Sequence, residues 1–345
     1  MRKYLLPQYG NFYKANLHCH SNISDGTKSP EELKELYQAQ GYSILAYTDH
    51  DIFIPHHDLT DDAFLALSGF ELQYNENGIY PNNKDIASTH FCFIAKSKET
   101  SLHPDWCEKC AYIGNAAKYK HLVQYDKTQQ TFNRSRSVEC INQSVKKARD
   151  AGFFVTYNHP IWSLDNYTNY INYDGMLAME IYNNECCLLG YHSYVPGIYD
   201  DMLRAGKKIF AIAADDNHNK FPADHPKFDS FGGFTMIKAA KLEYDTITDA
   251  LFEGNFYASQ GPKIYDLYVE EDNIHVRCSN AQMIVLNTGR RSAQTLVAPK
   301  GEALTEATFA FTKEDKYLRI TIQDLYGKYA NTNAYFVDKF PEELV

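Results

Sequence analysis

The sequence lacks any apolar run that approaches the ~20 residues an α-helix needs to cross a bilayer. Residues 1–8 also do not match the pattern of a secretory signal peptide, because they hold two basic residues but no apolar core of signal-peptide length before Pro7. These absences argue against a membrane or secreted protein. We therefore expect a cytoplasmic location and no membrane partner.

Positive charge is in deficit, with 34 Lys and Arg residues against 44 Asp and Glu residues and a net charge of −10. Sequence-independent binding of long nucleic acids depends on clustered Lys and Arg, so the composition argues against that class of protein. A phosphorylated substrate is still compatible with the negative net charge, since bound divalent metals would make the local electrostatic field positive.

Cysteine is sparse, and the eight residues are scattered as expected of reduced thiols rather than of a disulfide scaffold. His103, Cys107, Cys110 and the later His121 could form a zinc site. A zinc ribbon would normally show a second closely spaced Cys or His pair, which is missing here. We expect reduced cysteines, and the zinc site stays an alternative.

Core material is ample, because 44% of the residues are hydrophobic and 23% are charged. A chain of 345 residues fits one α/β barrel of ~250 residues and a small appendage. We expect two domains, formed by residues 1–262 and 263–345.

The first domain alternates strands and helices. After an expected strand at 12–17, a helix begins with Ser29 as N-cap, Pro30 at the first position and Glu32 closing a capping box. A second strand is expected at 43–47. This βαβ order predicts parallel strands whose polar carboxyl ends form the functional edge.

The alternation continues along the chain, except for a polar stretch at about 97–136 that predicts an insertion or lid beside the site. Helices are expected at 137–148 and about 246–253. Further strands are expected at 64–68, 90–95, 153–157, 177–182, 208–213 and 256–259. After residue 262 only short β-type runs with turns between them remain, which predicts a small all-β sandwich.

Potential metal ligands stand where the expected strands end. His18 and His20 have one residue between them, so on a strand both rings point the same way and could chelate one cation. Taken alone, this pair is equally typical of a solvated strand face. The full set is His18, His20, Asp25, His50, Glu71, His90, His159, Asp216 and His218.

Imidazole nitrogen mixed with carboxylate oxygen suits manganese, iron or zinc, whereas calcium and magnesium sites are nearly all oxygen. Nine ligands are too many for one ion. They are about right for three divalent ions that share a bridging carboxylate and leave positions open for water and substrate.

The ordered motifs resemble those of the polymerase and histidinol phosphatase (PHP) superfamily of metal-dependent phosphoesterases. The resemblance covers about residues 12–262 and implies an α/β fold, a distorted (β/α)7 barrel with a trinuclear centre at the carboxyl ends of the strands. The motifs are His18-x-His20, Ser24-Asp25-Gly26, Thr48-Asp49-His50-Asp51, Gly69-x-Glu71, His90, Asn158-His159-Pro160 and Asp216-x-His218.

The resemblance also implies which residues share an ion. His18, His20 and Asp216 would hold the first ion, and Glu71 would bridge it to a second. His90 and His159 would complete the second ion, while Asp25, His50 and His218 would hold the third. Asp215 stands where a small residue commonly precedes the closing aspartate, so the choice between Asp215 and Asp216 stays open.

The implied chemistry is phosphoester hydrolysis, in which a hydroxide between two metals attacks phosphorus in line. We expect an enzyme that hydrolyses a phosphomonoester of a small metabolite or a nucleotide. One alternative is a phosphodiesterase or exonuclease that trims short oligonucleotides. A non-enzyme alternative is a metal-bound binding or regulatory module.

Three cations are candidates for binding the substrate. Arg134 and Arg136 precede a helix N-terminus, where they could hold phosphate, although a solvated basic loop is the simpler reading. Lys220 lies two residues beyond His218. Asp49 and Asp51 flank His50 and either orient its ring or cap a turn.

Overall fold

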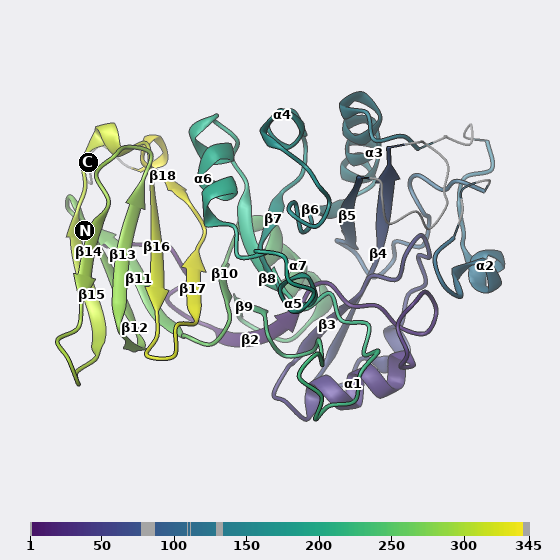
Figure 1. Cartoon of the computed structure of the whole chain (residues 1–345), viewed down its shortest axis with the longest axis horizontal. Helices are drawn as coiled ribbons and strands as arrows, with labels where there is room; N and C mark the ends of the chain where they lie inside the picture. Colours follow the sequence, from purple (N-terminus) through teal and green to yellow (C-terminus); the bar gives the residue numbers. More distant parts are fainter. Residues whose placement is uncertain (1, 77–86, 109, 111, 129–133, 341–345) are drawn as a thin grey trace.

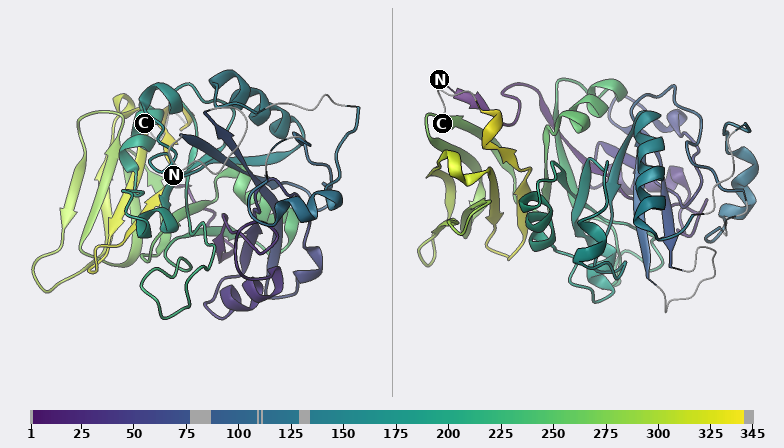
Figure 2. Two further views of the ribbon diagram at one scale, coloured as in Figure 1. Left: turned by 45° about the vertical axis from the view of Figure 1, so that its right-hand side comes forward. Right: turned by 90° about the horizontal axis from the view of Figure 1, so that it is seen from above.

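The computed structural model describes residues 2–76, 87–108, 110, 112–128 and 134–340. The molecule is elongated (Figures 1 and 2), with the C-terminal strands at one end and the expected insertion, including α2 (Ala116–Tyr119), at the other. The strands that carry the candidate ligands lie between them. The insertion is therefore far from the C-terminal strands and close to the ligand-bearing loops.

One mixed sheet runs through the molecule. In spatial order its strands are β14 (Gln294–Val297), β13 (Met283–Thr288), β16 (Tyr317–Gln323), β17 (Tyr329–Thr332), β10 (Phe256–Ser259), β9 (Phe234–Ala239), β2 (Asn11–Asn16), β3 (Ile44–Tyr47), β4 (Leu65–Asn75), β5 (Ser88–Ala95), β6 (Phe153–Tyr157), β7 (Ala178–Asn183) and β8 (Phe210–Ala214). Strands β2, β3 and β4 are parallel, as are β6, β7 and β8, and β5 is antiparallel to both of its neighbours. Most ligand-bearing strands were correctly expected.

In the described ranges the sheet is not closed by backbone pairing, so the distorted (β/α)7 barrel implied by the resemblance is not shown. Strand β9, which the sequence reading missed, occupies the edge of β2 and runs antiparallel to it. Strand β8 meets β9 through a side chain: Thr235 Oγ1 donates to the Ala213 carbonyl at 3.0 Å and accepts from the Ala213 amide at 3.3 Å.

Seven α-helices cover this sheet in the described ranges. They are α1 (Pro30–Gln38), α2, α3 (Val138–Asp150), α4 (Tyr167–Tyr170), α5 (Asn184–Leu188), α6 (Pro196–Arg204) and α7 (Tyr244–Glu253). The predicted caps are confirmed: Ser29 and Glu32 form a capping box, and Ser137 caps α3. None of these helices combines the length and apolar character that crossing a bilayer requires.

Helix α6 was missed, although its sequence carried a signal. Pro196 occupies the first turn, and Tyr199, Met202 and Leu203 form its buried stripe. The part of the chain that the structure describes also contains four short 3₁₀ helices, η1 (His57–Leu59), η2 (Lys120–Leu122), η3 (Lys313–Asp315) and η4 (Val337–Lys339).

The C-terminal strands form two layers with one shared core. The second sheet has the order β1 (Arg2–Tyr4), β11 (Ile264–Glu270), β12 (Asn273–Ala281) and β15 (Leu304–Ala310), while β18 (Tyr335–Phe336) pairs with β16. Leu267 and Ile274 pack in the same cluster as Ile284, Ile320 and Ile322 of the large sheet. The absence of α-helix from described residues 264–340 agrees with the expected all-β composition.

A clean boundary at residue 262 does not follow from this pairing. Strand β17 pairs with β10, and β1 from the N-terminus pairs with β11, so hydrogen bonds join the two expected domains in both directions. The division into residues 1–262 and 263–345 stays a prediction.

A buried ion pair attaches α6 to the C-terminal strands. Arg319 is 1% exposed, its Nη2 donates to Asp200 Oδ2 at 2.7 Å, and its Nη1 donates to Thr321 and Asn331 at 2.8 and 3.0 Å. Both Nη1 and Nη2 of the buried guanidinium therefore have hydrogen-bond acceptors.

We predict that Asp200→Ala lowers the free energy of unfolding by about 3 kcal/mol, because it leaves a buried guanidinium without its carboxylate. Urea denaturation followed by circular dichroism measures the change. Asp249→Ala is the matched control, since Asp249 pairs with Lys96 on the surface and such pairs contribute about 0–1 kcal/mol. Equal effects of the two substitutions would contradict the prediction.

Candidate metal centre

The nine predicted ligands come together in one cluster at the ends of the central strands. His18 and His20 follow β2, His50 follows β3, and His159 follows β6. The side chains fall into overlapping groups whose nitrogen and oxygen atoms lie within 4.8 Å of one another. These groups are His20, Asp25, His50 and His218; His18, His159 and Asp216; and His50, Glu71 and His90.

Glu71 is the centre of the cluster and is fully buried. Its Oε1 lies 3.2 Å from both His18 Nε2 and His90 Nδ1, and its Oε2 lies 3.1 Å from His50 Nδ1 and 3.4 Å from His20 Nε2. One carboxylate thus faces four imidazoles with both oxygens. This geometry is suited to a carboxylate that bridges two ions.

Asp216, and not Asp215, reaches the cluster. Asp216 Oδ1 lies 3.1 Å from the Nε2 atoms of both His18 and His20, and its Oδ2 lies 3.7 Å from His159 Nε2. The geometry therefore favours Asp216 as the ligand of the two.

Asp215 points the other way. Its carboxylate accepts from the Tyr37 hydroxyl and from the backbone amides of Phe231, Gly232 and Gly233 at 2.8–2.9 Å. Burial raises the pKa of Asp215 to about 7, although these donors oppose the shift. Its role in the structure is to hold the 231–233 loop.

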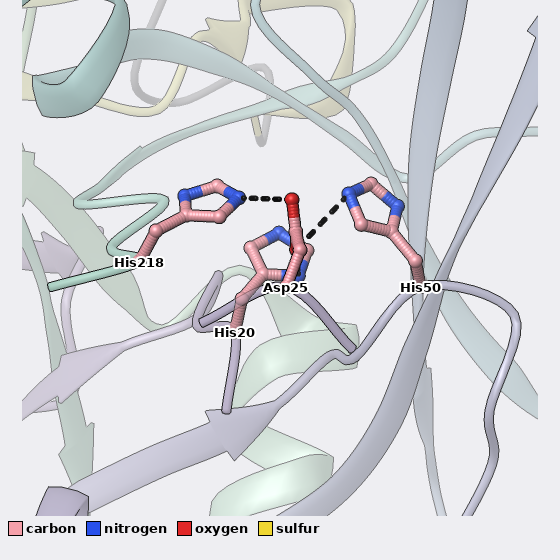
Figure 3. A group of neighbouring side chains, drawn as sticks. All are labelled: His20, Asp25, His50 and His218. Atoms are coloured by element: carbon pink, nitrogen blue, oxygen red, sulfur yellow. Dashed lines mark ion pairs between the residues drawn. The ribbon is translucent and has the colours of Figure 1, made fainter. Parts of the chain in front are cut away.

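Asp25 lies between His218 and His50 (Figure 3). Its Oδ2 is 3.3 Å from His218 Nε2, and its Oδ1 is 3.8 Å from His50 Nε2. The His20 ring stacks against those of His50 and His218, with centroids 4.4 and 4.5 Å away. His20 therefore stands between the group containing Asp216 and the group containing Asp25.

The outward nitrogens of several rings are fixed by other side chains. His18 Nδ1 lies 2.7 Å from Glu180 Oε1, His218 Nδ1 lies 3.2 Å from Glu185 Oε1, and His90 Nε2 lies 3.0 Å from the Ser88 hydroxyl. Such partners fix the orientation of a ring and the nitrogen that it offers to a metal.

Glu180, Glu185 and the buried thiol of Cys92 are site residues that the sequence reading missed. Cys92 groups with His18 and Glu71, and burial raises its pKa to about 12. A signal did exist for Glu180, because it is an acidic residue inside the apolar strand run at 177–182.

The donor set fits divalent metal ions. His18 Nε2 and His20 Nε2 lie 3.0 Å apart, so the pair can share no more than one hydrogen along that line, and the buried His50 Nδ1 has no hydrogen-bond partner. Burial, followed by repulsion from His20, lowers the pKa of His50 to about 3, which keeps its ring neutral and able to bind a metal.

Negative charge governs the other side of the cluster. Burial would lower the pKa of His18, but the neighbouring anionic groups, led by Asp216, raise it well above the ordinary value. Burial likewise opposes the charge of Asp216, yet His18 and His20 hold its pKa well below the usual range. The carboxylate is therefore ionised, as metal binding requires.

Of the three predicted substrate-binding cations, the structure brings only Lys220 to the cluster. Its Nζ lies 3.9 Å from Asp25 Oδ2, and its side chain is 50% exposed. Arg134 is buried and ion-paired with Asp51, and Arg136 Nη2 pairs with Asp165 at 2.6 Å.

The expectation that all cysteines are reduced is wrong for two of them. Cys107 and Cys110 form a disulfide, whereas the other six are free. Two cysteines separated by two residues bring their Cα atoms to 5.3 Å, which allows the bond. The alternative zinc site with His103 and His121 is therefore not formed, because it needs both sulfurs as thiolates.

Asp49 and Asp51 have separate roles. Asp49 accepts from the Ser21 amide and hydroxyl at 2.8 and 2.7 Å and from the Ser24 hydroxyl at 2.6 Å, so it shapes the loop that carries Asp25. Asp51 pairs with Arg134. Within the described residues, neither carboxylate is hydrogen-bonded to the His50 ring, so the expected orienting role is not observed.

No family model matches the sequence. A two-domain protein of Bacteroides vulgatus containing a predicted PHP-like metal-dependent phosphoesterase is 16% identical, with a TM-score of 0.44 and 93% of each chain covered. A protein of Bifidobacterium adolescentis that is described as a metal-dependent phosphoesterase is 15% identical. Its TM-score is 0.38, and the match covers 64% of this chain and 91% of that one.

A further match is short. A 5'-3' exoribonuclease of Haemophilus influenzae is 55% identical over 38 residues, which span 11% of this chain and only 14% of that protein. The exoribonuclease match therefore covers only a small part of both proteins.

We predict that Glu180→Gln weakens binding of the most tightly held divalent ion by about 10–100-fold, because the amide cannot orient the His18 ring as the carboxylate does. Metal content after dialysis against graded Mn²⁺ measures this. Glu306→Gln, on an exposed position of β15, is the control. Unchanged affinity in Glu180→Gln, with the fold intact, would show that the contact has no such role.

Proposed function

We propose that this protein is a metal-dependent hydrolase that removes phosphate from a phosphomonoester of a small metabolite or a nucleotide. The observation that supports this is the convergence of nine ligand side chains, Glu71 and Asp216 among them, in one cluster. Eight of the nine are buried, and Asp25 is partly exposed, which leaves one side of the cluster accessible.

Three divalent ions of manganese, iron or zinc are proposed to occupy the cluster. His18, His20 and Asp216 would hold one, Glu71, His90 and His159 a second, and Asp25, His50 and His218 the third, with Glu71 bridging the first two. When bound, such ions lower the pKa of water and neutralise charge on phosphoryl oxygens.

The residues of the chain supply orientation and substrate binding. Glu180 holds the His18 ring, and Glu185 holds that of His218. Lys220, half-exposed beside Asp25, is proposed to receive the phosphate of the substrate, because an ammonium group there can donate charge-assisted hydrogen bonds. Arg134 and Arg136 are less suited, because their side chains are only 4% and 13% exposed and each is held by a buried carboxylate.

A small substrate is favoured by the net charge of −10, which disfavours long polyanions. Trimming of short oligonucleotides is the second candidate, and the 38-residue match to an exoribonuclease is the observation that favours it. A non-catalytic metal-bound module is less favoured, because a module would tolerate the loss of ligands and this cluster is complete.

Three broader expectations stay proposals. The strands from β2 to β9 are proposed to form a distorted barrel. Between β8 and β9, the side chain of Thr235 would take the place of backbone pairing. The C-terminal β region, residues 263–345, is proposed to be a small sandwich domain. A cytoplasmic location is proposed from the sequence pattern alone.

We predict that His18→Ala and Asp216→Ala each lower metal-stimulated phosphate release by more than about 100-fold. Loss of a metal ligand should lower activity more than loss of a residue that only orients a ligand, such as Glu180. A phosphate-release assay with Mn²⁺ and metal analysis give the two readouts. His192→Ala, at an exposed histidine, is the control. Full activity in both ligand variants would refute the proposal.

The two candidate substrates are separated by one comparison. We expect faster turnover of nucleoside bisphosphates and sugar phosphates than of short RNA, measured as kcat/KM with the same metal-loaded preparation. The reverse order, with stepwise shortening of 5'-labelled RNA, would support the oligonucleotide alternative. No hydrolysis of any phosphoester by the metal-loaded protein would support the regulatory module.

We predict that Lys220→Ala raises KM for a phosphomonoester roughly tenfold with a smaller change in kcat, because one charge-assisted hydrogen bond contributes about 1.5–3 kcal/mol. Lys220→Arg should restore most of the affinity. Lys227→Ala, an exposed lysine of the same loop, is the control. An unaltered KM in Lys220→Ala would exclude phosphate binding by this residue.

A further inference from the structure

The insertion packs directly on the two loops that carry Asp25 and His50. Trp106, Ala116 and Val123 of the insertion share a small hydrophobic cluster with Ile23 and Ile52. Ile23 is two residues before Asp25, and Ile52 is two residues after His50. The insertion therefore forms the core beneath one side of the candidate metal centre.

Polar contacts fix the loop of Asp25 to the insertion. The Asn115 amide donates to the Ser24 carbonyl at 2.6 Å, and Asn115 Nδ2 donates to the Asn22 carbonyl at 3.0 Å. Gly114 has a φ of +57°, and a Cβ there would collide with the Ser24 carbonyl. Such a close approach admits only glycine. The backbone next to Asp25 is thus fixed by the insertion and not only by the strands of the sheet.

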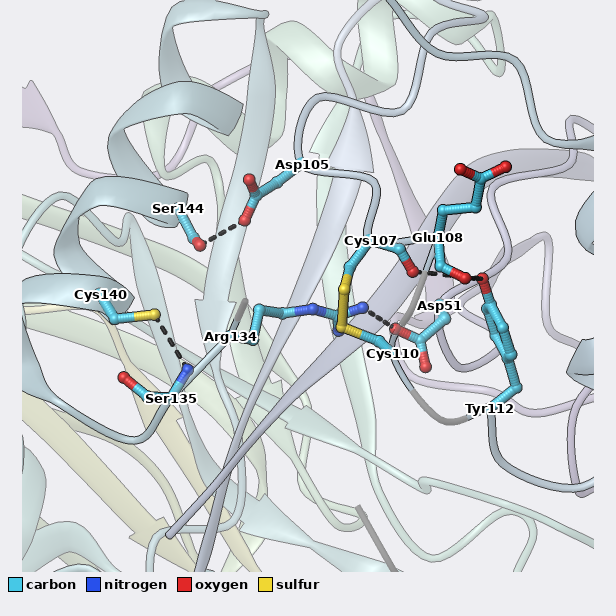
Figure 4. Close-up of a disulfide and its surroundings, with 10 residues drawn as sticks. All are labelled: Asp51, Asp105, Cys107, Glu108, Cys110, Tyr112, Arg134, Ser135, Cys140 and Ser144. Atoms are coloured by element: carbon cyan, nitrogen blue, oxygen red, sulfur yellow. Dashed lines mark hydrogen bonds and ion pairs between the residues drawn. A yellow bond between two sulfur atoms is a disulfide. The ribbon is translucent and has the colours of Figure 1, made fainter. Parts of the chain in front are cut away.

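The insertion is also fixed to the body of the protein. Asp105 accepts from the Ser144 hydroxyl of α3 (Figure 4). It also accepts from Lys147 Nζ at 2.9 Å. Arg134 pairs with Asp51, the neighbour of His50. The insertion consequently joins α3 to the loops of the metal centre.

The Cys107–Cys110 disulfide lies in the middle of this arrangement (Figure 4). Tyr112 donates its hydroxyl to the carbonyls of Cys107 and Glu108 at 3.2 and 3.3 Å, and its ring packs on Trp106 with centroids 5.6 Å apart. The disulfide thus closes the turn between Trp106 and the segment that reaches Asn115. Cys107 is buried, whereas Cys110 is partly exposed.

We infer that the insertion is a positioning element for Asp25 and His50, and that its disulfide makes the affinity of the ion held by these residues dependent on redox state. Among the described residues, the insertion makes no hydrogen bond or ion pair with His18 or Asp216, so we expect that side of the cluster to stay unchanged. This inference rests on the proposed metal centre. It adds redox regulation of one ion-binding position, which the proposed reaction does not require.

The redox step is thiol–disulfide exchange with a dithiol. One thiolate of the dithiol attacks the partly exposed Cys110 sulfur, the S–S bond breaks, and Cys107 leaves as a thiolate that takes a proton from solvent. The second thiolate of the dithiol then attacks the mixed disulfide and releases Cys110. The dithiol is oxidised to its own disulfide, and two electrons pass to the protein.

The test compares the oxidised protein with protein reduced by dithiothreitol and desalted under nitrogen. Equilibrium dialysis against graded Mn²⁺ with metal analysis gives the number and affinity of bound ions. We expect one ion to bind at least about tenfold more weakly after reduction, as when an outer partner of a ligand is lost. Cys107→Ser/Cys110→Ser should show the weaker binding without reduction, and dithiothreitol should not change it further.

Two variants separate positioning from general destabilisation. Trp106→Ala is expected to weaken the same ion while the disulfide stays closed, and Trp106→Phe should restore most of the affinity. Cys278→Ser, at a buried free cysteine of β12, is the control and should bind as the oxidised protein does.

Hydrogen exchange supplies a readout that needs no metal. Reduction should speed exchange of the Asn115 amide, which donates to Ser24, and leave that of the Asp216 amide, which donates to the His18 carbonyl at 3.0 Å. Equal metal binding in both redox states with an unchanged Asn115 amide would overturn the inference and leave the proposed function standing. Absence of divalent-ion binding in the oxidised protein would overturn both.

Discussion

The buried carboxylate of Glu71 is the constraint on which the centre of this protein depends. An ionised carboxylate without partners would be costly to bury, and Glu71 is placed among four imidazoles instead. Those histidines come from segments after β2, β3 and β6 and from β5 itself. The strands must therefore all end at the right depth for one side chain to be neutralised.

The surrounding structure limits how these side chains can move. Asp215 anchors the 231–233 loop behind Asp216, Asp49 shapes the loop before Asp25, and Glu180 holds the His18 ring. Each of these acids is buried and fully engaged in hydrogen bonds. Acidic residues in this protein thus divide into those that face the cluster and those that fix its backbone, and adjacent residues such as Asp215 and Asp216 can differ in role.

Much of the site could be predicted from the sequence, because apolar runs reveal the strands that carry or precede most of the ligands. Glu71 and His90 lie within β4 and β5 rather than beyond a strand end. Strand and cap signals were local, which is why β2, α1, β6 and the Ser137 cap were correctly expected. Glu180 and Cys92 were missed, since a single polar residue within a strand does not reveal which face it occupies before pairing is known.

Long-range pairing accounts for most of the other differences. Strand β9 takes the edge of β2, and β17 takes the edge of β10, and neither choice is encoded in any short stretch. The Cys107–Cys110 disulfide was missed because composition indicates only how many thiols exist, not which two the folded chain brings together.

The pairing of β10 with β17 has a consequence for shortened chains. A chain that stopped at Pro262 would keep every candidate ligand, yet it would present β10 with an unpaired row of amides and carbonyls. An exposed edge of this kind recruits strands from other molecules. The C-terminal strands therefore also cover the edge that β10 would otherwise expose.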